Sequence, residues 1–118
     1  MVEYRHYLES NECVFIPAYG RHKAKWAKLN DCLWVAPQMM RTKHPLGYLY
    51  HHVLHAEQID LLAHFFQKLL LVENASWKHL VDELRHARDN SSEDFDHILS
   101  LYNCLGRMEH LRYAADIR

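Results

Sequence analysis

The residues of this sequence with the clearest capacity for chemistry are its histidines. There are eleven in 118 residues, and four fall near one another: His51, His52, His55 and His64. His51 and His55 are four positions apart, so on a helix both imidazoles would lie on one side. Imidazole nitrogens bind zinc and haem iron, and two of them supply half of a four-coordinate site. The sequence therefore offers a candidate metal site at His51, His55 and His64, with zinc or haem as the cofactor.

The alternative for this cluster is a solvated or capping group of histidines near a helix end. A structural zinc site normally needs four ligands, and no cysteine or aspartate pair follows the cluster at a standard spacing. His79, His86 and His97 are interpreted in the same way, as exposed side chains of later helices. We therefore expect no cofactor and keep metal or haem binding as the second hypothesis.

Catalysis by a side chain has little support in the sequence. Cys32 lies in a short apolar stretch, where a cysteine usually serves as a small buried group. The chain contains no nucleophile elbow, HExxH motif, P-loop or glycine-rich loop. The adjacent carboxylates at 82–83 and 93–94 would diverge on a helix, which indicates a solvated face and a complement to a helix dipole. We predict that the protein is not an enzyme.

The overall charge narrows the class of partner. The net charge is -1 and the sequence pI is about 6.8, which argues against a dedicated binder of nucleic acid or of anionic membranes. A basic segment from Arg21 to Lys28 includes Trp26 and could hold a single strand by charge and stacking. A solvated loop is the preferred interpretation. Three cysteines without a CxxC spacing and a polar N-terminus predict free thiols and an intracellular location, cytoplasmic or nuclear.

The elements that must position these residues are mostly helical. Apolar side chains recur at spacings of three and four along residues 57–72, which predicts the helix around which the other elements pack. This stretch is too short and too polar at its start to span a bilayer. A helix from Pro45 breaks near position 55, another follows the N-cap Ser76 to about position 88, and the last runs from about position 93.

Two short β-branched and aromatic segments, residues 13–17 and 31–35, read as the strands of a wide hairpin laid against the helices. We predict a mainly α fold of the α+β class, with about four helices and a small β-hairpin packed on one side. Residues 1–118 are expected to form a single domain, with the hairpin at about 13–36 and the helical part at about 45–112.

The large apolar side chains near the hairpin and at the start of a later helix allow two interpretations. They are either core residues or exposed anchors for a partner, and the sequence weighs the two almost evenly. The candidate interaction residues are Trp26, Trp34, Met39, Met40 and Trp77.

The order of motifs resembles a known segment. It runs through Phe15-Ile16-Pro17, Leu29-Asn30-Asp31-Cys32-Leu33-Trp34, His44-Pro45-Leu46, Phe65-Phe66-Gln67-Lys68-Leu69-Leu70 and Asn74-Ala75-Ser76-Trp77. Over about residues 10–106 this is similar to a segment of large fungal proteins that carry a GHKL-type ATPase domain and are related to sacsin and the plant NO VEIN proteins. Tyr50-His51-His52 stands where that family often has Tyr-Pro, and none of its nucleotide motifs is present here.

The resemblance implies a non-catalytic structural or protein-interaction module of a chaperone-like protein. The ATPase of that family lies elsewhere in the long chain, and the matched residues are packing residues. The implied partner is a protein or a neighbouring domain of a longer chain, and neither nucleic acid nor a membrane is expected.

Overall fold

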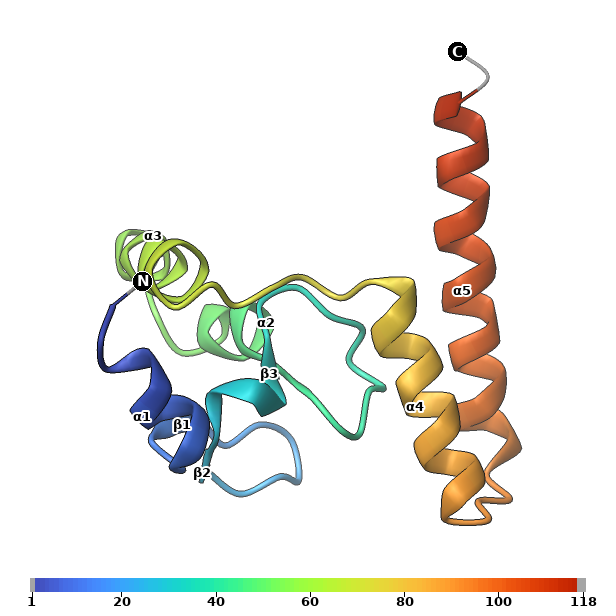
Figure 1. Cartoon of the computed structure of the whole chain (residues 1–118), viewed down its shortest axis with the longest axis horizontal. Coiled ribbons are helices and arrows are strands. Elements are labelled where there is room, and N and C mark those ends of the chain that lie inside the picture. Colours follow the sequence, from blue (N-terminus) through green and yellow to red (C-terminus); the bar gives the residue numbers. More distant parts are fainter. Residues whose placement is uncertain (1, 117–118) are drawn as a thin grey trace. The chain divides into compact units, whose positions relative to one another are not determined.

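The computed structural model describes residues 2–116, and the side chains of residues 2–108. The chain forms two compact units, each of which is described by itself. Unit 1 comprises Met1–Ala36 and Lys43–Asn74, and unit 2 comprises Pro37–Thr42 and Ala75–Arg118. The mainly helical α+β fold predicted from the sequence is confirmed (Figure 1). That the whole chain folds as one domain stays a prediction.

Unit 1 combines short strands with short helices. Its elements are α1 (Arg5–Ser10), β1 (Val14–Ile16), β2 (Lys25–Ala27), the 3-10 turn η1 (Leu29–Asp31), β3 (Cys32–Leu33), β4 (His44–Pro45), α2 (Leu46–His51), α3 (Ala56–Ala63) and the π-helical segment η2 (His64–Leu69). The break expected near position 55 is present, and His55 begins α3 by forming a capping box with Gln58. His55, one of the four clustered histidines, therefore caps the start of α3.

The hairpin is present, but its second strand is not the one predicted. β1 pairs antiparallel with β2, whereas Cys32–Leu33 pairs in parallel with His44–Pro45. The chain reverses early because Tyr19 and His22 exchange backbone hydrogen bonds across a turn at Gly20. Gly20 has φ 58, a conformation that glycine adopts without steric cost. The assignment of 31–35 as the partner strand was therefore wrong.

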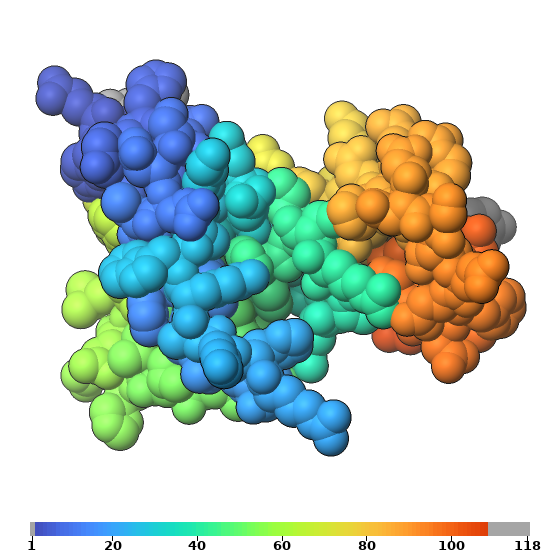
Figure 2. Space-filling view, turned by 90° about the horizontal axis from the view of Figure 1, so that it is seen from below, coloured from blue at the N-terminus to red at the C-terminus, as the bar shows by residue number. Residues whose placement is uncertain are grey.

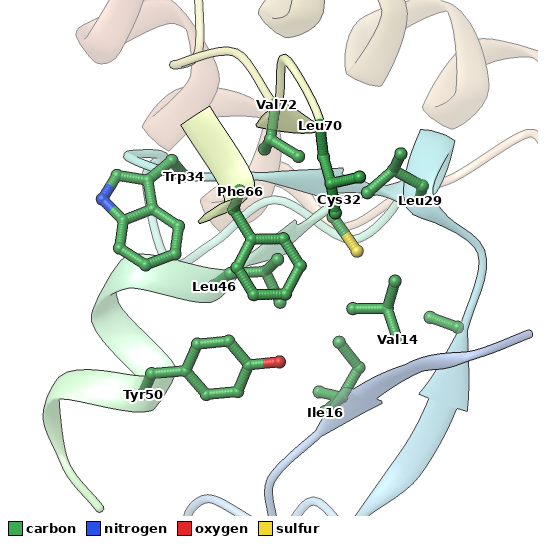
Figure 3. Close-up of a cluster of buried hydrophobic side chains, with 11 residues drawn as sticks. Val14, Ile16, Leu29, Cys32, Trp34, Leu46, Tyr50, Phe66, Leu70 and Val72 are labelled. Atoms are coloured by element: carbon green, nitrogen blue, oxygen red, sulfur yellow. The ribbon is translucent and has the colours of Figure 1, made fainter. Parts of the chain in front are cut away.

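The core of unit 1 gathers side chains from nearly all of its elements (Figure 3). The rings of Trp34, Tyr50 and Phe66 pack together with centroid separations of 5.8–6.4 Å. Leu46 and Leu70 are fully buried beside them. The complete cluster is Val14, Ile16, Ala27, Leu29, Cys32, Trp34, Leu46, Tyr50, Phe66, Leu70 and Val72.

The predicted central helix contributes less to this core than its composition indicated. Leu61 is 73% exposed, and only Phe66, Leu70 and Val72 of the stretch are buried. α3 turns one face to the core, where Ile59, Leu62 and Ala63 are partly buried, and the chain then passes into the π-helical segment at position 64. The π-helical segment ends at Leu69, and Leu71, two residues later, has a left-handed φ of 60. The apolar arc is thus an edge of the core and not its centre.

Unit 2 is built on two helices that lie side by side, α4 (Trp77–Asp89) and α5 (Phe95–Asp116) (Figure 1). The predicted N-cap Ser76 is confirmed, and it forms a capping box with His79. Leu80 and Leu101 are fully buried. The connecting turn includes Asp94, whose carboxylate accepts the N–H of His97 and so caps α5. Within residues 2–116, no helix has both the length and the apolar character needed to cross a membrane.

A buried carboxylate ties the loop 37–42 to α4. Glu83 is 1% exposed, and it accepts hydrogen bonds from the backbone N–H of Arg41 at 3.1 Å and of Thr42 at 2.7 Å. The hydroxyl of Thr42 donates to the same carboxylate, and Nε2 of His97 lies 4.0 Å from it. The interpretations of Glu83 as part of a solvated face and of His97 as exposed were wrong. A carboxylate can be buried here because the loop supplies its donors.

We expect Glu83→Ala to lower the free energy of unfolding by about 2–4 kcal/mol, because it leaves buried backbone N–H groups without an acceptor. Asp82→Ala is the matched control, since that neighbouring side chain is 63% exposed. Its effect should stay within about 0.5 kcal/mol. Urea unfolding followed by circular dichroism measures both. Equal effects for the two variants would show that Glu83 is not the anchor described above.

The turn after α4 provides a second expected outcome. Ser91 has φ 52, and the N–H groups of Ser91 and Ser92 bond to the carbonyls of Arg88 and Ala87 in a Schellman motif. Ser91→Gly should raise the free energy of unfolding by about 0.5–1 kcal/mol, because glycine adopts a left-handed φ without steric strain. The gain is smaller than the strain removed, because glycine also increases the conformational entropy of the unfolded chain. Ser91→Ala, which keeps a Cβ, should not stabilise the protein. Thermal unfolding of the two variants separates these results.

Candidate functional site

The outer face of the hairpin presents two aromatic side chains. On β1, Val14 and Ile16 point into the core, and on β2, Ala27 does. Side chains alternate along a strand, so Phe15 and Trp26, each next to one of these residues, point outward. The two are directly opposite each other across the strands, and their rings contact edge to face with centroids 5.1 Å apart and planes at 68°. Trp26 remains 57% exposed and Phe15 42%. The pair is therefore a fixed aromatic projection from a sheet whose other face is buried.

The segment of chain that carries this pair is rich in cationic residues. Residues 13–30 contain Arg21, Lys23, Lys25 and Lys28 and no aspartate or glutamate, so the segment carries +4 with histidine neutral. All four cationic side chains are exposed, and the segment is uncovered on the face seen in Figure 2. Because the whole chain carries -1, its other residues together carry -5. Lys25 alternates with Trp26 and points to the opposite face of β2, so we call the five residues Phe15, Arg21, Lys23, Trp26 and Lys28 the hairpin surface.

Hydrogen bonds from the core hold this surface in place. The hydroxyl of Tyr50 donates to the backbone carbonyl of Phe15 at 2.6 Å. The carbonyl of Lys28 accepts the N–H of Asp31 at 3.0 Å and the thiol of Cys32 at 3.4 Å. β1 is thus hydrogen-bonded to a core side chain, and Lys28, the residue after β2, is hydrogen-bonded to the turn that follows it and to Cys32. The aromatic pair keeps its orientation because its backbone is tied to the core.

A second group of rings lies at the turn of the hairpin. Tyr19, Tyr48 and His52 contact one another with centroid separations of 4.4–5.4 Å, and the two tyrosine hydroxyls share a hydrogen bond. Nδ1 of His52 lies 2.8 Å from the carbonyl of Tyr48. This contact joins the turn to α2. It also places His52, one of the four clustered histidines, among aromatic rings.

The structure divides the five candidate interaction residues. Trp34 and Met40 are buried and Met39 is partly buried, so the core interpretation describes these three. Trp26 and Trp77 are exposed to almost the same extent, 57% and 55%. Trp26 belongs to unit 1 and Trp77 to unit 2. The two exposed tryptophans are the residues to which the anchor interpretation still applies.

The candidate metal ligands His51, His55 and His64 are all exposed. His51 is the last residue of α2, His55 caps α3, and His64 is the first residue of η2. Among the residues that the structure describes, no group of three or more histidine, cysteine, aspartate or glutamate side chains is arranged to hold a metal ion. The zinc or haem hypothesis remains an expectation from sequence spacing.

Cys32 has the surroundings of a packing residue. Its side chain is buried in the core of unit 1, and burial raises the pKa of the thiol from 9.0 to about 12, with a smaller contribution from Asp31. The thiol is therefore protonated at neutral pH and is a weak nucleophile. This agrees with the interpretation of Cys32 as a small buried apolar group.

The role of Phe15 was missed from the sequence. The sequence predicts a β-branched and aromatic strand at 13–17 with one face of the hairpin on the helices, but this pattern alone does not say which side chains lie on the exposed face. The available signal was the pairing of Phe15 with Trp26, which becomes visible only when the turn at Gly20 is recognised. Once Trp26 is placed in a strand, its partner is an aromatic residue on the same face.

The buried hydroxyl of Tyr50 gives an expected dependence of stability on pH. Burial raises the pKa of Tyr50 from 10.0 to about 12, so the folded protein keeps this proton after the unfolded chain has lost it. The resulting stability is complete below pH 10 and is lost as pH rises toward 12, at up to about 1.4 kcal/mol per pH unit. Tyr50→Phe should show a shallower loss between pH 10 and 11 in urea unfolding. Equal slopes would contradict the role given to this hydroxyl.

Comparison of the chain with protein-family models, with curated proteins and with solved structures finds no match.

Proposed function

We propose that this chain is a non-catalytic structural and protein-interaction module that binds a protein partner through the hairpin surface. The observation that carries the proposal is Trp26, 57% exposed and held against Phe15 on the outer face of a sheet. Tryptophan is among the residues that contribute most to protein–protein binding. An aromatic pair that the fold leaves in water and holds rigidly is a suitable anchor for such a contact.

Rigidity supports this choice of surface. Binding loses free energy when loops and side chains must be ordered, at about 0.5–1.5 kcal/mol for each immobilised side chain. The backbone of Phe15 is already fixed by Tyr50, and the ring of Trp26 is already in contact with that of Phe15. Much of the ordering is therefore complete before a partner arrives.

The non-catalytic part of the proposal rests on how the reactive groups are used. Glu83 is engaged by the loop that it anchors, and Cys32 is protonated in the core. His55 and His79 take part in helix caps. These groups serve packing and local hydrogen bonding. The resemblance to sacsin-like fungal proteins adds the proposal that the partner is a protein or a neighbouring domain of a longer chain, in an intracellular setting.

Photo-crosslinking tests this function directly. A photoreactive phenylalanine analogue at position 15 of the full chain should capture a protein partner that then binds the purified chain. Trp26→Ala should reduce this binding at least about 10-fold, the loss expected for a central aromatic anchor. Trp77→Ala is the matched control, because its side chain is equally exposed but lies in unit 2. It should leave binding unchanged.

Two results would contradict the proposal. One is the absence of any purified partner whose binding depends on Trp26. The other is a partner whose binding depends on Trp77 and not on Trp26. Circular dichroism and urea unfolding of both variants show that each keeps its fold, so a loss of binding reports on the surface itself.

A further inference from the structure

The charge of the hairpin surface differs from that of the rest of the chain. Four cationic side chains lie within residues 13–30, and the acidic residues nearest in sequence, Glu12 and Asp31, lie just outside the segment at its two ends. A +4 segment in a chain whose remaining residues carry -5 is not a consequence of overall composition. Complementary charge on a partner would favour encounter with this surface and would fix its orientation.

The cations lie close to the aromatic anchor. Lys25 is adjacent to Trp26 on β2, and Lys28 follows two residues later. Side chains alternate along a strand, so Lys25 points to the face opposite Trp26, whereas Lys28, in extended backbone just past the end of β2, points to the same face as Trp26. A partner side chain resting on Trp26 would therefore have Lys28 two residues along the chain from the anchor, with the turn cations Arg21 and Lys23 beyond the other end of β2. An extended peptide with acidic residues at that spacing fits this arrangement.

The ring geometry favours a peptide over a single-stranded nucleic acid. Sequence-independent binding of single strands uses aromatic faces on which successive bases stack. Here the two rings meet at 68°, with the edge of one against the face of the other, so they do not form a parallel platform. Four cations would also neutralise few phosphates of a single strand.

From these observations we infer that the partner segment is an acidic peptide, with one large apolar side chain that docks on Trp26 and Phe15. Its carboxylates lie one or two residues from that side chain and pair with Lys28 and the turn cations Arg21 and Lys23. This inference rests on the proposed interaction function and specifies its partner. In this arrangement the apolar contact supplies most of the binding free energy, and the charges distinguish acidic partners from other peptides.

Fluorescence anisotropy with the full chain and defined probes tests the inference. The probe is a labelled nonapeptide with a central phenylalanine flanked on each side by two glutamates, in a glycine-serine background. It should bind at 50 mM salt and weaken several-fold at about 500 mM, where charge interactions are screened. A matched peptide with glutamines in place of the glutamates should bind at least about 10-fold more weakly, as should the glutamate peptide to Trp26→Ala.

A double charge reversal provides a second variant. Arg21→Glu combined with Lys23→Glu changes only exposed side chains of the turn, and it should reduce binding of the glutamate peptide while leaving the glutamine peptide unaffected. Trp77→Ala should bind both peptides as the unmodified chain does. Equal binding of the two peptides, or no binding of either, would overturn the inference. Preferential binding of a labelled single-stranded oligouridylate would overturn it in favour of nucleic acid.

The two proposals fail in different ways. If the crosslinked partner depends on Trp26 but the peptides show no preference for glutamate, the interaction function stands and the acidic class is wrong. If the glutamate peptide binds through Trp26 as described, the surface is a binding site of the stated charge class. If neither a partner nor the peptide depends on Trp26, both proposals are wrong.

Discussion

The strict alternation of a β-strand is the constraint on which the exposed surface depends. Burial of Val14 and Ile16 leaves Phe15 no inward position, and burial of Ala27 does the same for Trp26. A register shift of one residue would reverse both faces, so the core itself maintains the aromatic pair on the outside. The hydrogen bond from Tyr50 to the Phe15 carbonyl adds a second hold. In unit 1, the packing that buries one face of the hairpin therefore also exposes the aromatic pair on the other face.

In unit 2, hydrogen bonds to buried and surface carboxylates hold a loop against the helices. In the loop 37–42, Met40 is buried and Pro37 and Met39 are partly buried, and the backbone N–H groups at 41 and 42 donate to the carboxylate of Glu83. Arg41 then pairs with Asp94 at 2.6 Å, and this contact, followed by the N–H of His97, holds the pKa of Asp94 below its ordinary value. The start of α5, the middle of α4 and the loop are therefore linked through hydrogen bonds to two carboxylates.

The sequence predicted those features that depend on local spacing. Ser76 was identified as an N-cap because its position before an apolar stripe suffices, and the break near position 55 followed from helix length. Features that depend on distant partners were missed. The central stretch packs only one face of α3 on the core and is interrupted by the π-helical segment at 64–69, and Glu83 is buried because a loop some forty residues earlier donates to it. Nothing local to either segment carries that information.

Exposure by itself does not distinguish a binding residue from an ordinary surface residue, as the two exposed tryptophans show. Trp26 and Trp77 differ by only two percentage points in exposed fraction, 57% against 55%. Trp77 is the first residue of α4, and its ring has Lys78 Nζ at 5.8 Å from the centroid. Trp26 instead contacts a second aromatic ring, projects from a sheet tied to the core, and lies in a segment with four cations and no anion. It is this combination of rigidity, aromatic pairing and local charge that singles out the hairpin surface, since each property alone occurs elsewhere on a protein without a partner.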